Sequence, residues 1–451
     1  MKLFLIYFFI TQGWTVEQLT SNYKDQDHAS IKVYNGDAYI AYEEGDFSGA
    51  TGEIHLRIGK LFQWVKDTII FSSNSDFLWE PCIDIENGNI HIVFAGAFGD
   101  QLYYATNSGG TWQVYNLSFA YPAFEPFMKV KNDTLHLVYS RPFSSGITYA
   151  KVYRGEGNIE WSCNFGFYPS LEIDSAGHIH ISFDGYGGGG GIYYATNASG
   201  SWVYNQVIPP YCSRCAGTSI KLDSDGNIHI AYRANHESGT PIYYALGYAT
   251  NSSGSWTYIE LDSLIRLSSW PSIFVDKNGY IHIIYTKVTG GTIPPEIYYF
   301  TNKYGNWQKF YVTQNSWWDE EYTPSCFTID ESGYGWCVFA GYPISGIGDI
   351  FCAKTDTPLV NIKEKNLLSR SLSYVPLFFK DEIKIKIPSF YVNKILIYDK
   401  IGNLVYENSS HFYSSTIYLK DKKIKILPKG VYFLKIQEEG KEIAKFKLIK
   451  F

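Results

Sequence analysis

The chain has 451 residues, a formal net charge of −6, 18% aromatic residues and 40 glycines. Its length exceeds that of one ordinary hydrophobic core and predicts two domains, while its negative charge excludes nucleic acid as the main partner. Aromatic-rich segments separated by glycine turns are typical of an all-β protein.

The first residues are typical of a cleaved secretory signal. Lys2 precedes an apolar run, Leu3–Ile10, that is too short to span a bilayer. We expect a signal peptide over residues 1–13, and the alternative is a buried first strand. The sequence predicts no transmembrane segment.

Residues 14–357 contain seven copies of one pattern. The copies align on the histidine of an Ile-His-Ile type strand, with spacings of 44 to 54 residues. The aligned residues are Tyr39, His91, His136, His180, His229, His282 and Trp336. Each copy alternates apolar and polar residues over four short segments and cannot bury both of its faces alone. The repeats therefore predict a seven-bladed β-propeller, in which stacked units bury one another.

The last copy lacks one strand. It has strand-like segments at Cys326–Asp330, Gly335–Phe339 and Asp349–Lys354, but no Trp-bearing fourth segment. Gly13–Leu19 has the sequence pattern of Gly254–Leu261, which is such a fourth segment. We expect residues 14–20 to form the outer strand of the seventh blade, so that the N-terminal strand closes the ring.

The turns within the repeats resemble a known family. Thr250–Trp256 recurs as Thr106–Trp112 and Thr196–Trp202, and these segments resemble the Asp-box turn of sialidase-like propellers, with Asn or Ser in place of aspartate. The resemblance implies a propeller whose active face lies opposite these turns. Sialidase chemistry would need an arginine triad, and no arginine here lies in the Arg-Ile-Pro type motif of that family.

Composition changes sharply near Thr357–Asn361, which predicts a domain boundary. Residues 361–451 hold 18 Lys and Arg against 9 Asp and Glu, and all 12 Trp precede them. Ile397–Tyr406, Leu427–Lys435 and Ala444–Phe451 resemble the C-terminal sorting domain of bacterial type IX secretion. The resemblance implies a small β-sandwich over 361–451, recognised by the outer-membrane secretion machinery, in a secreted or cell-surface protein. Asn403 stands where that family has a basic residue, and an accessory fibronectin-like domain is the alternative.

No pattern in the chain predicts a metal or a cofactor. The repeat histidines come from different blades, so packing or a repeated strand-to-strand hydrogen bond is favoured over shared metal ligation. Asp223–Asn227 lacks the downstream glutamate of an EF-hand loop and is expected to be a glycine turn. Cys212 and Cys215 could pair with each other or with other cysteines, and a bridge between Cys337 and Cys352 is sterically possible.

Loops that enter first strands or leave second strands should meet on the face opposite the Asp-box-like turns. The candidate ligand-binding residues on this face are Trp79, Glu80, Arg141, Asp184, Arg233, Trp270, Trp317, Trp318, Asp319 and Glu320. The same loops carry Glu43, Glu44, Tyr121, Phe124, Glu125, Phe167, Tyr168, Tyr211, Lys287 and Glu321. Aromatic rings beside charged groups suit sugar rings. The sequence therefore favours a non-enzymatic glycan- or polysaccharide-binding protein, with a protein-interaction scaffold or a glycoside hydrolase at the same face as alternatives.

Overall fold

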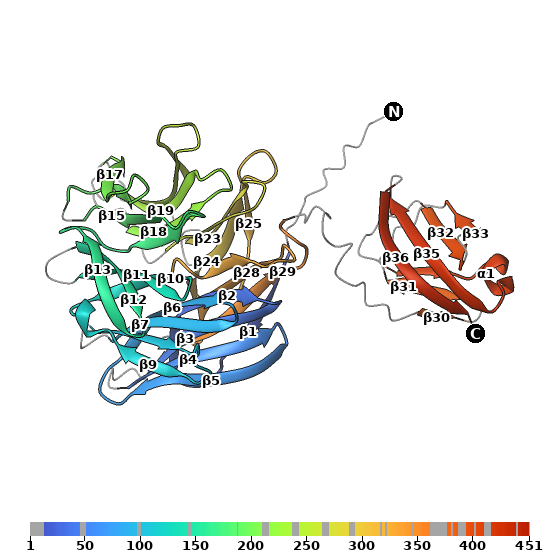
Figure 1. Ribbon diagram of the computed structural model, residues 1–451, viewed down its shortest axis with the longest axis horizontal. Coiled ribbons are helices and arrows are strands. Elements are labelled where there is room, and N and C mark those ends of the chain that lie inside the picture. Colours follow the sequence, from blue (N-terminus) through green and yellow to red (C-terminus); the bar gives the residue numbers. More distant parts are fainter. Residues whose placement is uncertain are drawn as a thin grey trace. The chain divides into compact units, whose positions relative to one another are not determined.

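The chain divides into two compact units, Met1–Ile362 and Lys363–Phe451. The computed structural model describes residues 13–45, 51–96, 101–141, 146–186, 188–209, 216–236, 243–263, 270–287, 294–315, 318–320, 323–344, 347–360, 377–379, 382–386, 394–400, 403–409, 416–438 and 441–450. Regular structure in these ranges is β-strand (Figure 1), apart from the 3-10 helix η1 (Ser118–Ala120) and the short helix α1 (Lys422–Ile426). The prediction of an all-β chain is confirmed. The expected signal peptide lies almost wholly outside the described residues.

No helix in the described ranges is long and apolar enough to cross a membrane.

Six sheets of the first unit each contain four antiparallel strands that pair in sequence order. The first three are β2 (Asp25–Tyr34), β3 (Asp37–Gly45), β4 (Gly52–Lys60) and β5 (Gln63–Ser73); β6 (Leu78–Glu86), β7 (Asn89–Gly96), β8 (Gln101–Thr106) and β9 (Gln113–Asn116); and β10 (Phe124–Lys131), β11 (Thr134–Arg141), β12 (Gly146–Tyr153) and β13 (Glu156–Ser162). The next three are β14 (Ser170–Ile173), β15 (Ile179–Asp184), β16 (Ile192–Thr196) and β17 (Val203–Ile208); β18 (Ala216–Leu222), β19 (Ile228–His236), β20 (Tyr243–Thr250) and β21 (Thr257–Ser263); and β22 (Ser272–Val275), β23 (Ile281–Lys287), β24 (Glu296–Thr301) and β25 (Gln308–Tyr311).

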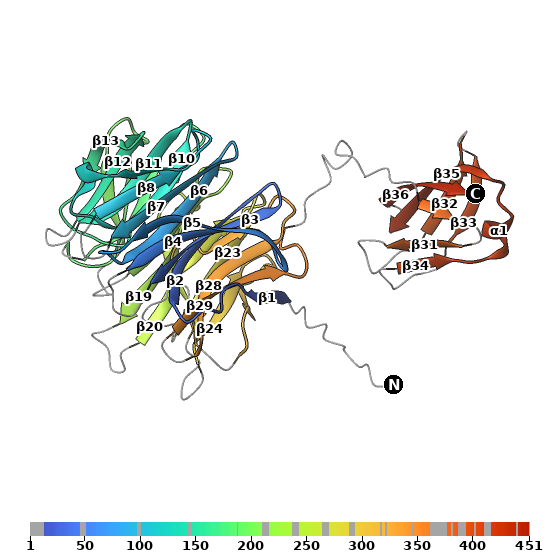
Figure 2. The same cartoon turned by 90° about the horizontal axis from the view of Figure 1, so that it is seen from below.

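A seventh sheet combines both ends of the unit. Its strands are β1 (Trp14–Gln18), β29 (Ile347–Thr355), β28 (Gly335–Ile344), β26 (Trp318–Glu320) and β27 (Phe327–Ile329). β1 pairs antiparallel with β29, from Trp14 opposite Thr355 to Gln18 opposite Phe351, and Figure 2 shows β1 beside this sheet. The prediction that the N-terminal strand completes the last sheet is confirmed, whereas β26 was not predicted as a strand.

The sheets pack side by side through their first strands. β2 contacts β6, β6 contacts β10, and the contacts continue through β14, β18 and β22 to β27, which again contacts β2. The cycle of contacts therefore returns to the first sheet. Each sheet buries its apolar residues against the two neighbouring sheets, as a stack of small repeats requires.

Tryptophan packing supports the position of β1. Trp202, Trp256 and Trp307 each pack against a tyrosine of the preceding sheet, with ring centroids 5.2, 5.4 and 5.3 Å apart. Trp14 packs against Tyr299 in the same way, at 5.7 Å. Trp14 therefore supplies the tryptophan that the last repeat lacks.

The repeat histidines form cross-strand hydrogen bonds. In each of five sheets the histidine Nδ1 lies 2.6 to 2.7 Å from a tyrosine hydroxyl on the third strand. The pairs are His91–Tyr104, His136–Tyr149, His180–Tyr194, His229–Tyr248 and His282–Tyr299. The prediction of a repeated strand-to-strand hydrogen bond is confirmed.

The turns of the repeats are held by asparagine and aspartate side chains. In the Asp-box-like turns, Asn107, Asn197 and Asn251 accept an N–H from the first or second residue of the second strand at 2.7 to 2.8 Å. The carboxylate of Asp223 accepts the N–H groups of Asp225 and Asn227 at 2.9 and 2.8 Å. The prediction that Asp223–Asn227 is a turn is confirmed, with Gly226 at a φ of 82°.

The suggested bridge between Cys337 and Cys352 is wrong, because the two buried residues form no disulfide with each other. Cys337 lies opposite Ala353, and Cys352 lies opposite Val338. Since neighbouring residues of a strand point to opposite faces of the sheet, the two thiols lie on opposite faces. Cys212 and Cys215 lie outside the described residues.

The described residues of the second unit form two sheets. One has the order β30 (Leu377–Phe379), β36 (Lys441–Lys450), β35 (Gly430–Glu438), β32 (Lys394–Asp399) and β33 (Leu404–Asn408), and the other pairs β31 (Ile383–Lys386) with β34 (Thr416–Leu419). Ile395, Ile397, Ile424 and Leu434 are fully buried in this unit. Asp421 caps the N-terminus of α1 by accepting the N–H of Ile424 at 3.1 Å.

Candidate functional site

The first strands of successive sheets share an irregularity at their start. β2, β6, β10 and β18 each contain a shift of register near their first residues. The residues at this place have a positive φ: His28, Glu80, Glu125, Tyr168 and Gly217, from 41° to 59°. Because a β-bulge redirects the side chain of its extra residue, the bulges in β2, β6 and β10 turn the side chains of His28, Glu80 and Glu125 away from the regular ladder.

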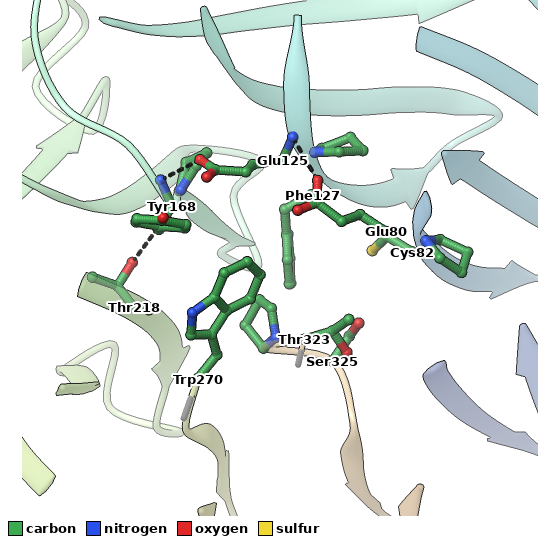
Figure 3. Close-up of a pocket in the computed structure, with 14 residues that line it drawn as sticks. Glu80, Cys82, Glu125, Phe127, Tyr168, Thr218, Trp270, Thr323 and Ser325 are labelled. Atoms are coloured by element: carbon green, nitrogen blue, oxygen red, sulfur yellow. Dashed lines mark hydrogen bonds between the residues drawn. The ribbon is translucent and has the colours of Figure 1, made fainter. Parts of the chain in front are cut away.

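Glu80, Glu125, Tyr168 and Gly217 line, together with their neighbours, an opening between the sheets, which we call the mouth (Figure 3). It is lined by Glu80, Pro81, Cys82, Glu125, Pro126, Phe127, Tyr168, Pro169, Gly217, Thr218, Trp270, Thr323, Pro324 and Ser325. The enclosed space is about 30 Å³, which accommodates one or two waters but no sugar ring. A larger ligand would therefore lie across the mouth.

Carboxylates connect the sheets around one side of the mouth. Glu43 accepts the backbone N–H of Glu80 at 3.1 Å, and its other oxygen lies 2.9 Å from His28 Nδ1. Glu80 accepts the N–H of Glu125 at 2.8 Å, and Glu125 accepts the N–H of Tyr168 at 2.9 Å. We call Glu43, Glu80 and Glu125 the carboxylate chain, because each carboxylate binds a backbone N–H in the first strand of the next sheet or two residues before that strand.

The carboxylate chain has unusual protonation. Burial raises the pKa of Glu80 to about 7, and burial together with the nearby Glu80 raises the pKa of Glu125 well above its usual range. Burial opposes the charge on His28, but Glu43 and Asp27 outweigh it and raise the pKa of His28 to about 10. Near neutral pH, the carboxylate chain therefore contains protonated carboxyl groups beside the partly buried cation of His28.

Aromatic rings form a continuous row beside these carboxylates. Phe124 packs on Phe167 at 5.7 Å, and Phe167 contacts Tyr186 at 5.5 Å and Tyr168 at 6.3 Å. Tyr168 then packs on Trp270, with centroids 4.9 Å apart. We call these five residues the aromatic row, whose members are partly exposed, Tyr186 to 42%.

The predicted residues nearest the mouth have different roles. Glu80 and Trp270 line the mouth, and the ring of Trp79 packs edge-on against His28 at 6.3 Å. Asp184 is buried and accepts the N–H of Phe167 at 2.8 Å, which positions the aromatic row. Burial raises the pKa of Asp184 to about 7, and the nearby Arg233 partly offsets this effect.

The other predicted residues do not line the mouth. Arg141 donates to the carbonyl of Cys163 at 2.9 Å. Trp318 is 49% exposed, whereas Asp319 and Glu320 are buried next to it in β26. Trp317, Tyr211 and Glu321 lie outside the described residues.

Sequence reasoning missed His28 and Thr218. The hydroxyl of Thr218 donates to the carbonyl of Tyr168 at 2.9 Å, which connects two sheets at the mouth. The sequence did contain a signal for the residues around the mouth. Proline directly follows one residue at the start of five repeats: Glu80, Glu125, Tyr168, Trp270 and Thr323. Proline has no N–H to donate to a ladder and tolerates a bulge.

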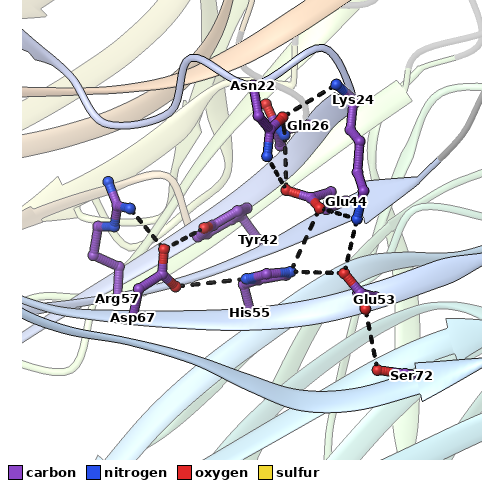
Figure 4. Close-up of polar contacts among 10 residues, drawn as sticks. All are labelled: Asn22, Lys24, Gln26, Tyr42, Glu44, Glu53, His55, Arg57, Asp67 and Ser72. Carbon is purple, nitrogen blue, oxygen red and sulfur yellow. Dashed lines mark hydrogen bonds and ion pairs between the residues drawn. The ribbon is translucent and has the colours of Figure 1, made fainter.

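A second polar cluster lies between β2, β3, β4 and β5, away from the mouth (Figure 4). Lys24 Nζ lies 2.5 Å from Glu44 and 3.2 Å from Glu53, and His55 lies 3.4 Å from Glu53. One ligand atom from each of Glu44, Glu53 and His55 lies within 4.8 Å of the others, which would suit a cation. The ammonium of Lys24 binds two of these ligands, so a metal would have to displace it.

Comparisons with known proteins identify the C-terminal unit. Residues 378–450 match the secretion system C-terminal sorting domain. The second unit is therefore a sorting domain, which indicates export by the type IX secretion system to the cell surface or the medium. No curated protein matches the chain by sequence.

Several solved structures are similar to this chain at low sequence identity. A polysaccharide lyase of family PL25, an ulvan lyase bound to -[GlcA(1-4)Rha3S]-, has a TM-score of 0.52 and 14% identity over 74% of this chain and 95% of that chain. PorZ, a surface component of the type IX secretion system of Porphyromonas gingivalis, has a TM-score of 0.39 and 10% identity over 93% and 70%. An α-L-arabinofuranosidase from Fusarium graminearum has a TM-score of 0.42 and 11% identity over 61% and 91%. These neighbours are not specifically sialidases, so the sialidase-like part of the resemblance stays a prediction.

Proposed function

We propose that residues 14–357 form a seven-bladed β-propeller that binds a glycan or polysaccharide across its mouth without cleaving it, outside the cell. The aromatic row carries this proposal. Rings that are partly exposed and continuous over several sheets offer stacking surfaces for the C–H faces of successive sugars. The seven sheets in a closed cycle of contacts support the propeller, and a density map with another number of radial sheets would contradict it.

The shape and chemistry of the mouth favour binding over catalysis. The enclosed space is too small for a sugar ring, and Glu80 and Glu125 already accept backbone N–H groups of neighbouring residues. A carboxylate with such a structural role cannot move freely toward a scissile bond. Ligand hydroxyls would instead meet the remaining carboxyl oxygens at the rim.

A glycan array followed by calorimetry on the full-length protein tests the proposal. We expect binding of at least one polysaccharide, and Trp270→Ala should weaken that binding about tenfold because a stacking surface is lost. Phe62→Ala is the matched control, since Phe62 is a 67% exposed aromatic residue on the β4–β5 turn. Equal affinities for the two variants would contradict the proposed site. An array without any signal, combined with a protein captured at the same face, would favour the scaffold instead.

A glycoside hydrolase is the second candidate, because Glu80 has a pKa near 7 and could donate a proton at neutral pH. Fluorogenic glycosides distinguish this candidate from simple binding. Turnover that disappears in Glu80→Gln, while binding persists, would establish it.

A further inference from the structure

One position recurs on the first strand of every sheet of the first unit, and six of its seven residues line a cavity next to the mouth, which we call the channel. It is the residue that pairs with the repeat-histidine position of the second strand. The seven residues are Lys32, Asp84, Lys129, Glu172, Lys221, Phe274 and Thr328. We call the first five the charge belt, because their charges alternate along five successive sheets.

The members of the charge belt form shared ion pairs. Lys32 lies 3.1 Å from Asp84, and Lys129 lies 3.3 Å from Glu172. Lys221 also binds Glu172, so this one carboxylate serves two ammonium groups. These side chains keep 12 to 27% of their surface exposed. The belt is therefore accessible from the channel.

The belt has three cations and only two anions. Its two ends, Lys32 and Lys221, are lysines, and the two remaining positions of the cycle hold the uncharged Phe274 and Thr328. A negative charge at this gap would continue the alternation and pair with both end lysines. The hydroxyl of Thr328 can donate a hydrogen bond there, and the positive edge of an aromatic ring such as Phe274 favours an anion.

Space for a ligand exists at this level. A cavity of about 200 Å³ is lined by Lys32, Lys129, Glu172, Lys221, Phe274 and Thr328, among others, whereas one water needs only about 15 Å³. Cys82, Phe127, Pro324 and Ser325 line both this cavity and the mouth (Figure 3). A solute that reaches the mouth is therefore next to the belt.

We propose that the channel contains a binding site for a small anion with a carboxylate or sulfate group, held between Lys221 and Lys32 at the gap formed by Phe274 and Thr328. Charge-assisted hydrogen bonds from two ammonium groups in a partly buried site are the strong class of such contacts. The site does not depend on the proposed function of the mouth.

The pKa values of the charge belt are consistent with an anion-binding site at Lys221. Burial, with Lys129 and Lys32 nearby, lowers the pKa of Lys221 to about 7. Glu172 and Asp84 outweigh burial at Lys129 and raise its pKa, and the lysines lower the pKa values of Glu172 and Asp84. Cys82 stays a neutral thiol because burial raises its pKa. Anion binding should therefore take up a proton at Lys221, and affinity should fall as the pH rises above about 7.

Calorimetry and thermal melts of the full-length protein test this site. The titrants are sodium sulfate, acetate and D-glucuronate, with ionic strength held constant by a bulky sulfonate buffer. We expect saturable binding and a rise in Tm with at least one titrant, and Lys221→Met should weaken it about tenfold or more. Lys60→Met is the control, because it removes the same charge from an exposed hairpin lysine paired with Asp37.

A second pair of variants tests the site by adding a negative charge at the gap instead of removing a lysine. Thr328→Asp should abolish the response to anions and raise Tm in their absence, whereas the uncharged Thr328→Asn should retain the response. A wild-type protein without saturable binding would overturn the proposal. The same conclusion would follow if Lys221→Met bound as well as Lys60→Met, or if the two Thr328 variants behaved alike. A response to sulfate and acetate identifies a free anion as ligand, and a response to glucuronate alone identifies a sugar-borne carboxylate.

Discussion

The central opening has a charged side and an uncharged side. From β2 to β18 the first strands carry charged residues below the mouth, and the carboxylate chain joins the first four of these sheets. Around β22 and β27 the same levels hold uncharged residues, and sheets are joined by hydroxyls: Ser272 donates to the carbonyl of Pro324 at 2.8 Å, and Thr323 donates to that of Ala29 at 2.8 Å. On both sides, side chains form hydrogen bonds with backbone polar groups where sheets meet. Only on the charged side are these side chains titratable, so only there does the connection between sheets depend on pH.

The largest difference between the two sides should come from removing one connecting side chain. Glu125→Ala leaves the N–H of Tyr168 and the hydroxyl of Ser140 without their acceptor, so we expect a loss of about 3 kcal/mol in unfolding free energy. Ser272→Ala should cost only about 1 kcal/mol. Urea denaturation measures both, with Glu125→Gln as the control that keeps an acceptor. Equal losses for the two alanine variants would remove the distinction between the sides.

The second effect is the pH dependence of stability. Glu80 and Asp184 have pKa values raised to about 7 in the folded protein. Their stabilisation is therefore complete below the unfolded pKa near 4 and is lost as the pH rises through about 7. His28, with its pKa raised to about 10, loses its contribution over a higher range of pH.

We therefore expect Tm to fall between pH 5 and pH 9, and Glu80→Gln should make this decrease smaller by up to about 3 kcal/mol in equivalent free energy. Calorimetric melts at a series of pH values measure the slope. The same substitution at the exposed Glu156 is the control and should leave the slope unchanged. A Tm that rises over this range would show that the carboxylate chain is ionised in the folded protein.

The smallest expected effect is the loss of one hydrogen bond between a repeat histidine and its tyrosine, and this loss should cost the same on both sides. His91–Tyr104 belongs to the charged side and His282–Tyr299 to the uncharged side, yet both hydrogen bonds measure 2.6 Å. Tyr104→Phe and Tyr299→Phe should each cost about 1 kcal/mol, measured by urea denaturation. Clearly different costs would mean that the asymmetry extends beyond the first strands.

Repetition made the fold predictable from the sequence. The repeat-histidine positions and the glycine turns recur at regular spacing, and Trp14 matches the tryptophan that the last repeat lacks. Each repeat must pack on the next to bury its apolar face. The aromatic row was also predicted in part, because Phe124, Phe167, Tyr168 and Trp270 occupy equivalent loops.

The polar details were not predictable in the same way. The positive φ of His28, Glu80 and Glu125 depends on local register shifts, which non-glycine residues adopt only in a supporting structure. Trp318, Asp319 and Glu320 were expected to face a ligand, but β26 pairs with β28 and buries both acids. The charge belt did have a signal, since each member stands seven or eight residues before the histidine position of its repeat.

The pairing of β1 with β29 has a consequence for how the domain folds. The hydroxyl of Thr15 donates to Asp356 across 341 positions of the chain, so the beginning of the domain cannot complete its structure until the end has been made. Until then β29 presents an unpaired backbone edge, which is a template for association with other strands. Such distant closure is slow compared with the local hairpins. The edge of β29 is therefore covered only after the whole domain has been synthesised.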